Sequence, residues 1–239
     1  MTNHLRRLLA GAALFLTEFA LVLLVGVLGV VGFLYISREV LDQHAAPFDE
    51  AAFRWTQQFF GRERQQWVEG VTFLASRNFI VVASLALIGW FLVLRRHRWY
   101  TLMVPVVALG GICLNLVLKN IYQRPRPLLP LTSASGLSFP SGHAMISACF
   151  YGLLIYLVAT HVRRHRGLRV VLMVGLSLLI LLIGATRVYL RVHYATDVLA
   201  GFLAGITWLL IAIPLIRRLE KTIRKRFQRN PQLVEKQAQ

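Results

Sequence analysis

Six long apolar runs, separated by polar segments, constrain this 239-residue chain more than any other feature. A helix needs about 20 apolar residues to cross the hydrocarbon core of a bilayer. The runs cover Leu8–Ile36, Phe79–Leu94, Thr101–Leu118, Ala144–Thr160, Leu168–Ala185 and Val198–Ile216. Some are shorter than 20 residues, so we expect their helices to extend into flanking polar residues. The pattern predicts an all-α, polytopic membrane protein with six transmembrane helices and both termini on one side.

Residues 37–78 form the longest polar stretch, yet one apolar helical face runs through it. Phe48, Ala52, Trp55 and Phe59 recur at spacings of four, three and four, as on one side of a helix. Two interpretations are open: a helix packed over the bundle, or a helix lying at the bilayer surface beside a lipid entrance. The predicted architecture includes this segment as an extracytoplasmic interfacial helix.

The distribution of positive charge predicts the orientation in the membrane. Seventeen of the 27 Lys and Arg residues lie in the N-terminus, the 95–100 and 161–169 loops and the C-terminal tail, and cytoplasmic segments are enriched in these residues. We therefore expect cytoplasmic termini, a membrane domain over 1–216 and a basic cytoplasmic tail over 217–239. The net charge of +17 then reflects topology and anionic lipid, not nucleic acid.

Three features inside the apolar runs have ordinary explanations. Glu18 is expected to accept a structural hydrogen bond from a neighbouring helix. Cys113 and Cys149 are expected to be small buried hydrophobic residues, not disulfide or metal ligands. Gly201 and Gly205 form a GxxxG pair, which permits close helix packing.

Two polar segments that would lie on the outer side suggest an anion site. Lys119–Pro127 holds three cations at the mouth of a span, where snorkelling side chains are the ordinary explanation. Phe139–His143 brings a hydroxyl, a glycine and a histidine before the next apolar run. Glycine lets the backbone approach an oxyanion, and N–H groups at a helix N-terminus attract negative charge. A serine that only caps the helix would explain the same residues.

A third segment, Thr186–Asp197, adds a histidine and a carboxylate four residues apart. On a helix His193 and Asp197 would share one face and hydrogen-bond. A carboxylate that holds one imidazole nitrogen as N–H leaves the other free as base or nucleophile, and a helix-end capping pair is the alternative. Two histidines, several cations and a glycine cradle together favour phosphoryl transfer through a histidine, with no metal and no cofactor.

In order and spacing, these segments resemble the three motifs of the type 2 phosphatidic acid phosphatase family. The matches are Lys119-x6-Arg126-Pro127, Pro140-Ser141-Gly142-His143 and Arg187-x5-His193-x3-Asp197. They define a three-motif core over 119–197. Thr186 stands where the family usually has serine, and because threonine keeps the hydroxyl we expect no loss of activity.

The resemblance implies a role for each matched residue. His193 would attack phosphorus and form a phosphohistidine, Asp197 would orient it, and His143 would protonate the leaving oxygen and then activate water. The phosphate would be held by Lys119, Arg126, Ser141, Gly142 and Arg187. Arg124 and Arg191 fall outside the matched positions, and we interpret them as surface cations, with a wider cationic rim for a diphosphate as the alternative.

The implied function is a metal-independent lipid phosphatase of a bacterial inner membrane, whose active site faces the periplasm or cell exterior. Its substrate would be a membrane lipid that carries a phosphomonoester or diphosphate: phosphatidylglycerol phosphate, phosphatidic acid or diacylglycerol pyrophosphate. A phosphatidylglycerophosphatase-B-like enzyme is favoured, with undecaprenyl-diphosphate phosphatase and lipid A phosphatase as alternatives. Two other classes stay open, a vanadium haloperoxidase-like oxidoreductase and a non-catalytic protein that binds or transports a phospholipid.

Overall fold

The structure is a computed structural model that describes residues 2–94 and 99–229, apart from the side chains of 2–16, 18, 19, 62 and 224–229. The side chain of Glu18 therefore lies outside the described residues. The helices are α1 (Thr2–Leu41), α2 (Ala46–Phe60), the 3₁₀ turn η1 (Arg62–Arg64), α3 (Gln65–Phe73), α4 (Arg77–Val93), α5 (Tyr100–Tyr122), α6 (Gly142–His161), α7 (Arg166–Tyr189) and α8 (Ala195–Arg229).

Six spans in the described part of the chain are long and apolar enough to cross a membrane, which confirms the predicted fold class. They lie in α1, α3 with α4, α5, α6, α7 and α8. In α1 and α7 only 11% of the most apolar window is buried, so their leucine and valine side chains face outward, as contact with lipid requires. The expected start of the second span at Phe79 lies inside α4, because Ser76 caps that helix by accepting a hydrogen bond from the Phe79 N–H.

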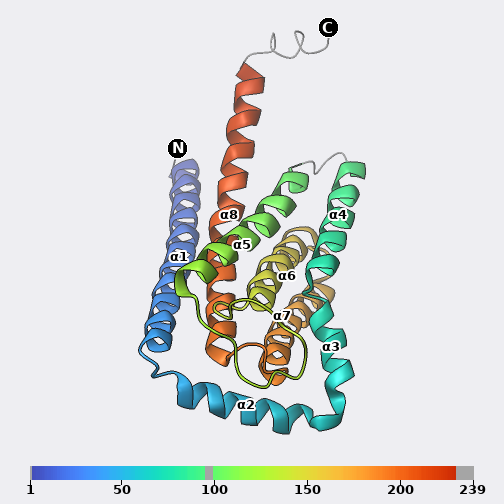
Figure 1. The fold of residues 1–239 in the computed structure, drawn as a ribbon. Coiled ribbons are helices and arrows are strands. Elements are labelled where there is room, and N and C mark those ends of the chain that lie inside the picture. The colour runs from blue at the N-terminus through green and yellow to red at the C-terminus, as the bar shows by residue number, and fades with distance from the viewer. Residues whose placement is uncertain (1, 95–98, 230–239) are drawn as a thin grey trace.

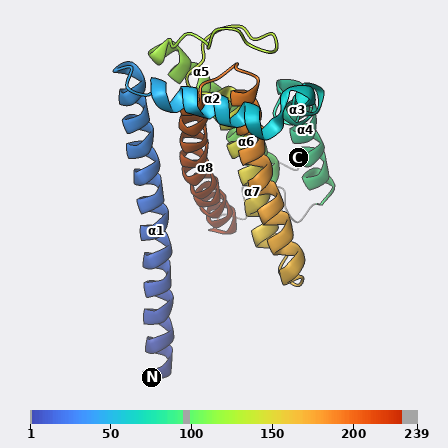
Figure 2. The ribbon, with the colours of Figure 1, turned by 90° about the horizontal axis from the view of Figure 1, so that it is seen from below.

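The helices form a bundle whose one end is crossed by α2 (Figures 1 and 2). α2 connects the end of α1 to α3, and the start of α1 and the end of α8 both point away from it (Figure 1). α6 is the central helix and packs against α5, α7 and α8, while α1 packs against α8. The loops near α2 therefore share one end of the bundle.

α2 turns its predicted apolar face outward. Phe48, Trp55 and Phe59 are 52%, 57% and 65% exposed, and the last two rings stack on each other. The buried face lies one residue further along the helix and consists of Asp49, Phe53, Thr56 and Phe60. Of the two interpretations, an apolar face that points away from the protein supports the interfacial helix.

Gly201 and Gly205 bring α8 against the first turns of α6. A Cβ atom at Gly201 would lie 2.7 Å from the carbonyl oxygen of Ser141, and one at Gly205 would lie 2.6 Å from that of Met145. The predicted packing role of the GxxxG pair agrees with these contacts. The close approach falls at the start of α6, where the second motif lies.

Two further expectations concern the cysteines and the C-terminal tail. Cys149 is buried as predicted, but the same prediction is wrong for Cys113, which is exposed on an outward side of α5 where lipid accepts an apolar thiol. α8 continues as one helix through residue 216 to Arg229. The division into a membrane domain and a tail at residue 216 stays a prediction.

Candidate active site

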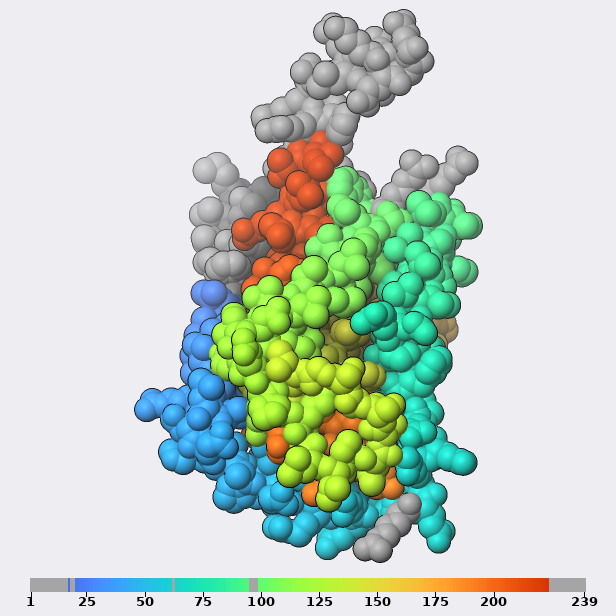
Figure 3. Space-filling model, viewed as in Figure 1, coloured from blue at the N-terminus to red at the C-terminus, as the bar shows by residue number. Residues whose placement is uncertain are grey.

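The three sequence motifs meet at the end of the bundle crossed by α2. Lys119 lies in the last turn of α5, Gly142 begins α6, Arg187 lies in the last turn of α7, and Asp197 lies in the first turn of α8. The 123–141 loop covers this end, and orange atoms from the α7–α8 junction show through it in Figure 3. Four helix ends thus bring together residues that are far apart in the sequence.

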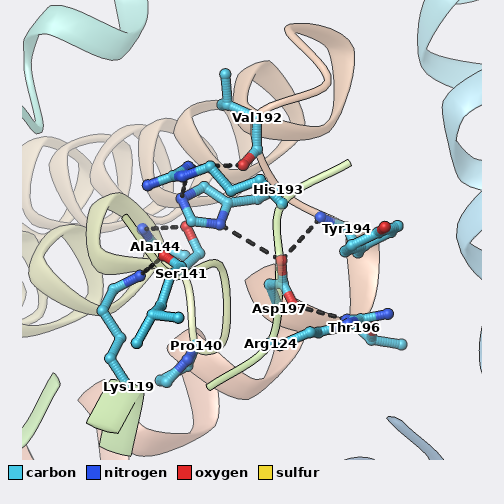
Figure 4. Close-up of polar contacts among 12 residues, drawn as sticks. Lys119, Arg124, Pro140, Ser141, Ala144, Val192, His193, Tyr194, Thr196 and Asp197 are labelled. Atoms are coloured by element: carbon cyan, nitrogen blue, oxygen red, sulfur yellow. Dashed lines mark hydrogen bonds and ion pairs between the residues drawn. The ribbon is translucent and has the colours of Figure 1, made fainter. Parts of the chain in front are cut away.

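His193 and Asp197 are paired, but not on one helical face as predicted. His193 lies in the turn before α8, which begins at Ala195. Its Nδ1 still lies 3.4 Å from Oδ2 of Asp197, an ion-pair contact without the geometry of the predicted hydrogen bond, and the Tyr194 N–H donates a 2.9 Å hydrogen bond to the same oxygen. The carboxylate therefore closes back on the helix start, as in a capping box. Both side chains are buried and point toward each other (Figure 4).

The other ring nitrogen of His193 faces a cation. Its Nε2 lies 3.3 Å from Nη1 of Arg126, and a guanidinium can only donate. The neutral imidazole therefore presents its Nε2 lone pair to Arg126 and keeps its proton on Nδ1, toward Asp197. Burial lowers the pKa of His193 to about 4, with Arg187 and Arg126 acting in the same direction and Asp197 opposing them. At neutral pH the imidazole is uncharged.

The predicted phosphate-binding cations Lys119, Arg126 and Arg187 lie near this histidine, and none of them forms an ion pair with a carboxylate of the described residues. Lys119 and Arg126 donate to backbone carbonyls in the 123–141 loop, Lys119 to that of Leu137. Arg187 donates a 2.9 Å hydrogen bond to Oγ1 of Thr72, while its buried Nε has no hydrogen-bond partner in the described part of the chain. Guanidinium and ammonium groups held in this way can accept an anion.

The second motif contributes the start of α6. Ser141 accepts a hydrogen bond from a backbone N–H of the first turn, and its own N–H donates a 2.9 Å bond to the carbonyl oxygen of Asp197. A Cβ at Gly142 would lie 3.2 Å from Oδ1 of Asn115, so a larger residue would crowd this position. His143 is half-buried and interacts electrostatically with His193 and the three cations.

A cavity of about 310 Å³ opens beside Lys119 and Arg126, between α4, α5, α6 and the 123–141 loop. Its lining combines apolar side chains of α4, α5 and α6 with the cations Arg77, Lys119 and Arg126. Such a cavity joins an apolar surface to a cationic end. It can therefore accommodate an amphiphile with an anionic head group.

Sequence reasoning missed a buried ionic group behind Asp197. The interpretation of Arg124 as a surface cation is wrong, because its side chain is 15% exposed and donates to Oδ1 of Asp197 at 2.7 Å and to Oδ2 of Asp49 at 2.9 Å. Asp49 comes from α2 and also accepts hydrogen bonds from Thr196. An aspartate among apolar residues on α2 was the available signal, but it lies 75 residues from Arg124.

Arg191 and Thr186, also singled out in the sequence, contact other protein groups. The guanidinium of Arg191 lies 4.9 Å over the ring of Phe53, which leaves the wider cationic rim without support. The Thr186 hydroxyl donates to the carbonyl oxygen of Ile183 within α7. Among the described residues, no group of three or more His, Cys, Asp or Glu side chains is placed to hold a metal ion.

Comparison with known proteins gives consistent matches. A family model described as the PAP2 superfamily matches residues 99–221. Phosphatidylglycerophosphatase B of Bacillus subtilis strain 168 is 34% identical over 148 residues, which cover 60% of this chain and 72% of that protein. Undecaprenyl-diphosphatase BcrC of the same strain is 25% identical over 144 residues, which cover 57% and 68%.

A solved structure agrees with the fold. The crystal structure of a transmembrane PAP2 type phosphatidylglycerolphosphate phosphatase from Bacillus subtilis matches with a TM-score of 0.73 and 27% identity, over 81% of this chain and 96% of that one. The expectation of a phosphoric ester hydrolase is confirmed by these relatives. Neither the haloperoxidase nor the binding-protein alternative gains support from them.

Proposed function

Because this chain belongs to the PAP2 superfamily, we propose that it is a lipid phosphatase that works through a phosphohistidine on His193 and needs no metal. The observation that carries the mechanism is the setting of one imidazole. Nε2 lies 3.3 Å from Arg126 and Nδ1 lies 3.4 Å from Asp197. A neutral imidazole in this setting directs its lone pair toward the cations that would hold the phosphate.

In the first step, Nε2 of His193 attacks phosphorus as the phosphorus–oxygen bond to the lipid breaks. His143 donates a proton to the leaving oxygen, and Asp197 stabilises the positive charge that develops on the imidazole. The non-bridging oxygens are held by Lys119, Arg126, Arg187, Ser141 and Gly142. Removing one such donor typically costs about 2.7–4 kcal/mol of transition-state stabilisation.

In the second step, water replaces the histidine. His143, now neutral, takes a proton from the water, whose oxygen attacks phosphorus as the phosphorus–nitrogen bond breaks. Inorganic phosphate leaves and His193 returns to its neutral form. One histidine thus serves as acid and then as base while the other carries the phosphoryl group.

We favour phosphatidylglycerol phosphate as the substrate. The support is the 34% identity to phosphatidylglycerophosphatase B, together with a cavity lined by both cations and apolar side chains. Undecaprenyl diphosphate is the second candidate, since the BcrC relative is an undecaprenyl-diphosphatase. Both substrates present a phosphate at the head of a lipid.

The proposed orientation places the active site on the periplasmic or cell-exterior face of a bacterial inner membrane. The site lies at the α2 end of the bundle, whereas α1 begins and α8 ends at the other (Figure 1). Seventeen of the 27 Lys and Arg residues belong to the termini and to the two loops assigned to that other end. The basic residue rule makes it cytoplasmic.

The test is phosphate release by detergent-purified protein from a panel of lipid phosphates and diphosphates in EDTA. Wild type is compared with His193→Ala and with His44→Ala, since His44 is an exposed histidine that precedes α2. We expect release by wild type and His44→Ala and none by His193→Ala. Release that survives in His193→Ala, or folded wild type that hydrolyses no lipid of the panel, contradicts the proposal.

A further inference from the structure

The catalytic carboxylate proposed above divides its two oxygens between different partners. Oδ2 of Asp197 faces Nδ1 of His193 and accepts the Tyr194 N–H. Oδ1 accepts a 2.7 Å hydrogen bond from Arg124. Asp197 is fully buried, so its charge depends on these contacts for stabilisation. Arg124 is thus the cation directly behind the nucleophile pair.

Arg124 is itself fixed on every side. Nη1 also donates a 2.8 Å hydrogen bond to Oγ1 of Thr196, and Nη2 donates a 2.9 Å bond to Oδ2 of Asp49. The guanidinium carbon lies 3.9 Å over the ring of Tyr194. Hydrogen bonds in the guanidinium plane and an aromatic face beside it define one orientation, which a flexible ammonium could not reproduce.

Asp49 connects this group to the interfacial helix. Its side chain lies on the inner face of α2 and is 1% exposed. It accepts hydrogen bonds of 2.9 Å from the Thr196 N–H and of 3.0 and 2.9 Å from the Thr196 hydroxyl. Thr196 lies in the first turn of α8, directly before Asp197. α2 is therefore bonded to the helix start that carries the catalytic carboxylate.

We infer that Asp49 and Arg124 are positioning residues, through which α2 fixes the Asp197 carboxylate that orients the nucleophile. The inference rests on the proposed function of His193 and Asp197. Two carboxylates share one guanidinium, so the group keeps a net negative charge behind the imidazole. Because Arg124 is also paired with Asp49, it neutralises less of the negative charge of Asp197. More of that charge is then available to stabilise the imidazole as it becomes positive during attack.

The outer face of α2 suggests how the membrane could influence the position of Asp49. Phe48, Trp55 and Phe59 are exposed and suit the bilayer interface. The position of α2 in lipid and the orientation of the nucleophile are therefore linked through Asp49, by its contacts with Arg124 and with Thr196.

The test compares Asp49→Asn, Arg124→Gln and Arg124→Lys with wild type in phosphate release. Glu50→Gln and Arg54→Gln are matched controls, because both side chains lie exposed on α2. We expect kcat to fall about 10- to 100-fold in Asp49→Asn and Arg124→Gln, the usual loss when the partner behind a catalytic ligand is removed, with KM within about threefold. Arg124→Lys should be intermediate, and both controls should match wild type.

A second readout distinguishes positioning from a structural role. In Arg124→Gln the unshielded Asp197 should raise the midpoint of the acid limb of kcat/KM by about one pH unit. The other charged groups that face His193, namely Arg126 from the loop, Arg187 from α7 and His143 from α6, stay in place. A merely structural role lowers activity together with thermal stability and does not move the limb.

The outcomes are separable. Folded variants with wild-type kcat, or variants that lose activity in proportion to stability with an unmoved acid limb, overturn the inference. Should Arg124→Gln not fold, Asp49→Asn carries the test by its kcat, because its amide oxygen still accepts from Thr196. A wild type that releases no phosphate overturns the proposed function instead, and with it the basis of the inference.

Discussion

Replacing Gly201 by alanine should push α8 away from the start of α6 and so separate the second and third motifs. The added Cβ would lie 2.7 Å from the carbonyl oxygen of Ser141, 3.1 Å from Cβ of Ala144 and 3.2 Å from the amide nitrogen of Met145. Two of these atoms belong to the backbone and cannot rotate away. Reaching an ordinary carbon–oxygen contact of about 3.3 Å requires a separation of roughly 0.6 Å.

The magnitude follows from what this separation moves. Overpacking of this kind costs about 1–3 kcal/mol of stability. The N–H of Ser141 is hydrogen-bonded to the Asp197 carbonyl oxygen, so the shift changes the distance between the proposed phosphate-binding residues and the proposed catalytic carboxylate. Because a misplacement of about 1 Å can cost a factor of about 100 in rate, we expect kcat to fall roughly tenfold.

The assay measures thermal unfolding by tryptophan fluorescence and phosphate release on the same detergent preparation. Gly175→Ala is the matched control, since Gly175 lies within α7 with no atom within 4 Å of its added Cβ. That control should keep its kcat and gain about 0.5–1 kcal/mol, as alanine usually does over glycine in a helix. Wild-type Tm and kcat in Gly201→Ala would refute the packing argument.

Three further predictions concern the chemistry. EDTA should leave phosphate release unchanged and vanadate should inhibit by adopting the five-coordinate geometry of the transition state, whereas a requirement for added divalent metal would count against the mechanism. Because burial lowers the pKa of His193 to about 4, the nucleophile is neutral above that pH; kcat/KM, corrected for ionisation of the substrate, should persist to about pH 5 and fall on further acidification. A midpoint near the ordinary histidine value of about 6.5 would contradict this. Thr72→Val removes the acceptor of the Arg187 hydrogen bond, worth about 1.5–3 kcal/mol for a charged donor, so kcat/KM should drop about 10- to 100-fold while Thr72→Ser keeps it; equal activity of the two variants would show that this bond does not position Arg187.

The spans and the motif residues could be predicted because both depend on local sequence. Lipid requires long apolar helices. The four-residue spacing from His193 to Asp197 keeps these two side chains in contact even though His193 lies in the turn before α8. The buried group behind Asp197 could not be predicted in the same way. Its partners, Asp49 and Arg124, lie 75 residues apart, and only the tertiary fold brings them together.

α2 shows a second reason for the limit. In a water-soluble protein the apolar face of an amphipathic helix points to the core, and that rule assigns Phe48, Trp55 and Phe59 to the inside. Here these side chains are exposed and Asp49 is buried, an arrangement that suits a helix lying at a bilayer interface. Sequence periodicity identifies the faces of a helix but does not say which of them meets the protein.

The most direct test of the central claim is capture of the phosphoenzyme. Protein mixed with substrate labelled with ³²P at its phosphate is quenched in alkali, which preserves a phosphoramidate, and the labelled peptide is sequenced. The account predicts label on His193, stable in base and lost in acid, and none in His193→Ala. Label on another residue would contradict a phosphohistidine mechanism. So would the absence of label at every time point, both in wild type during turnover and in a His143 variant, in which hydrolysis of the phosphoenzyme should be slow.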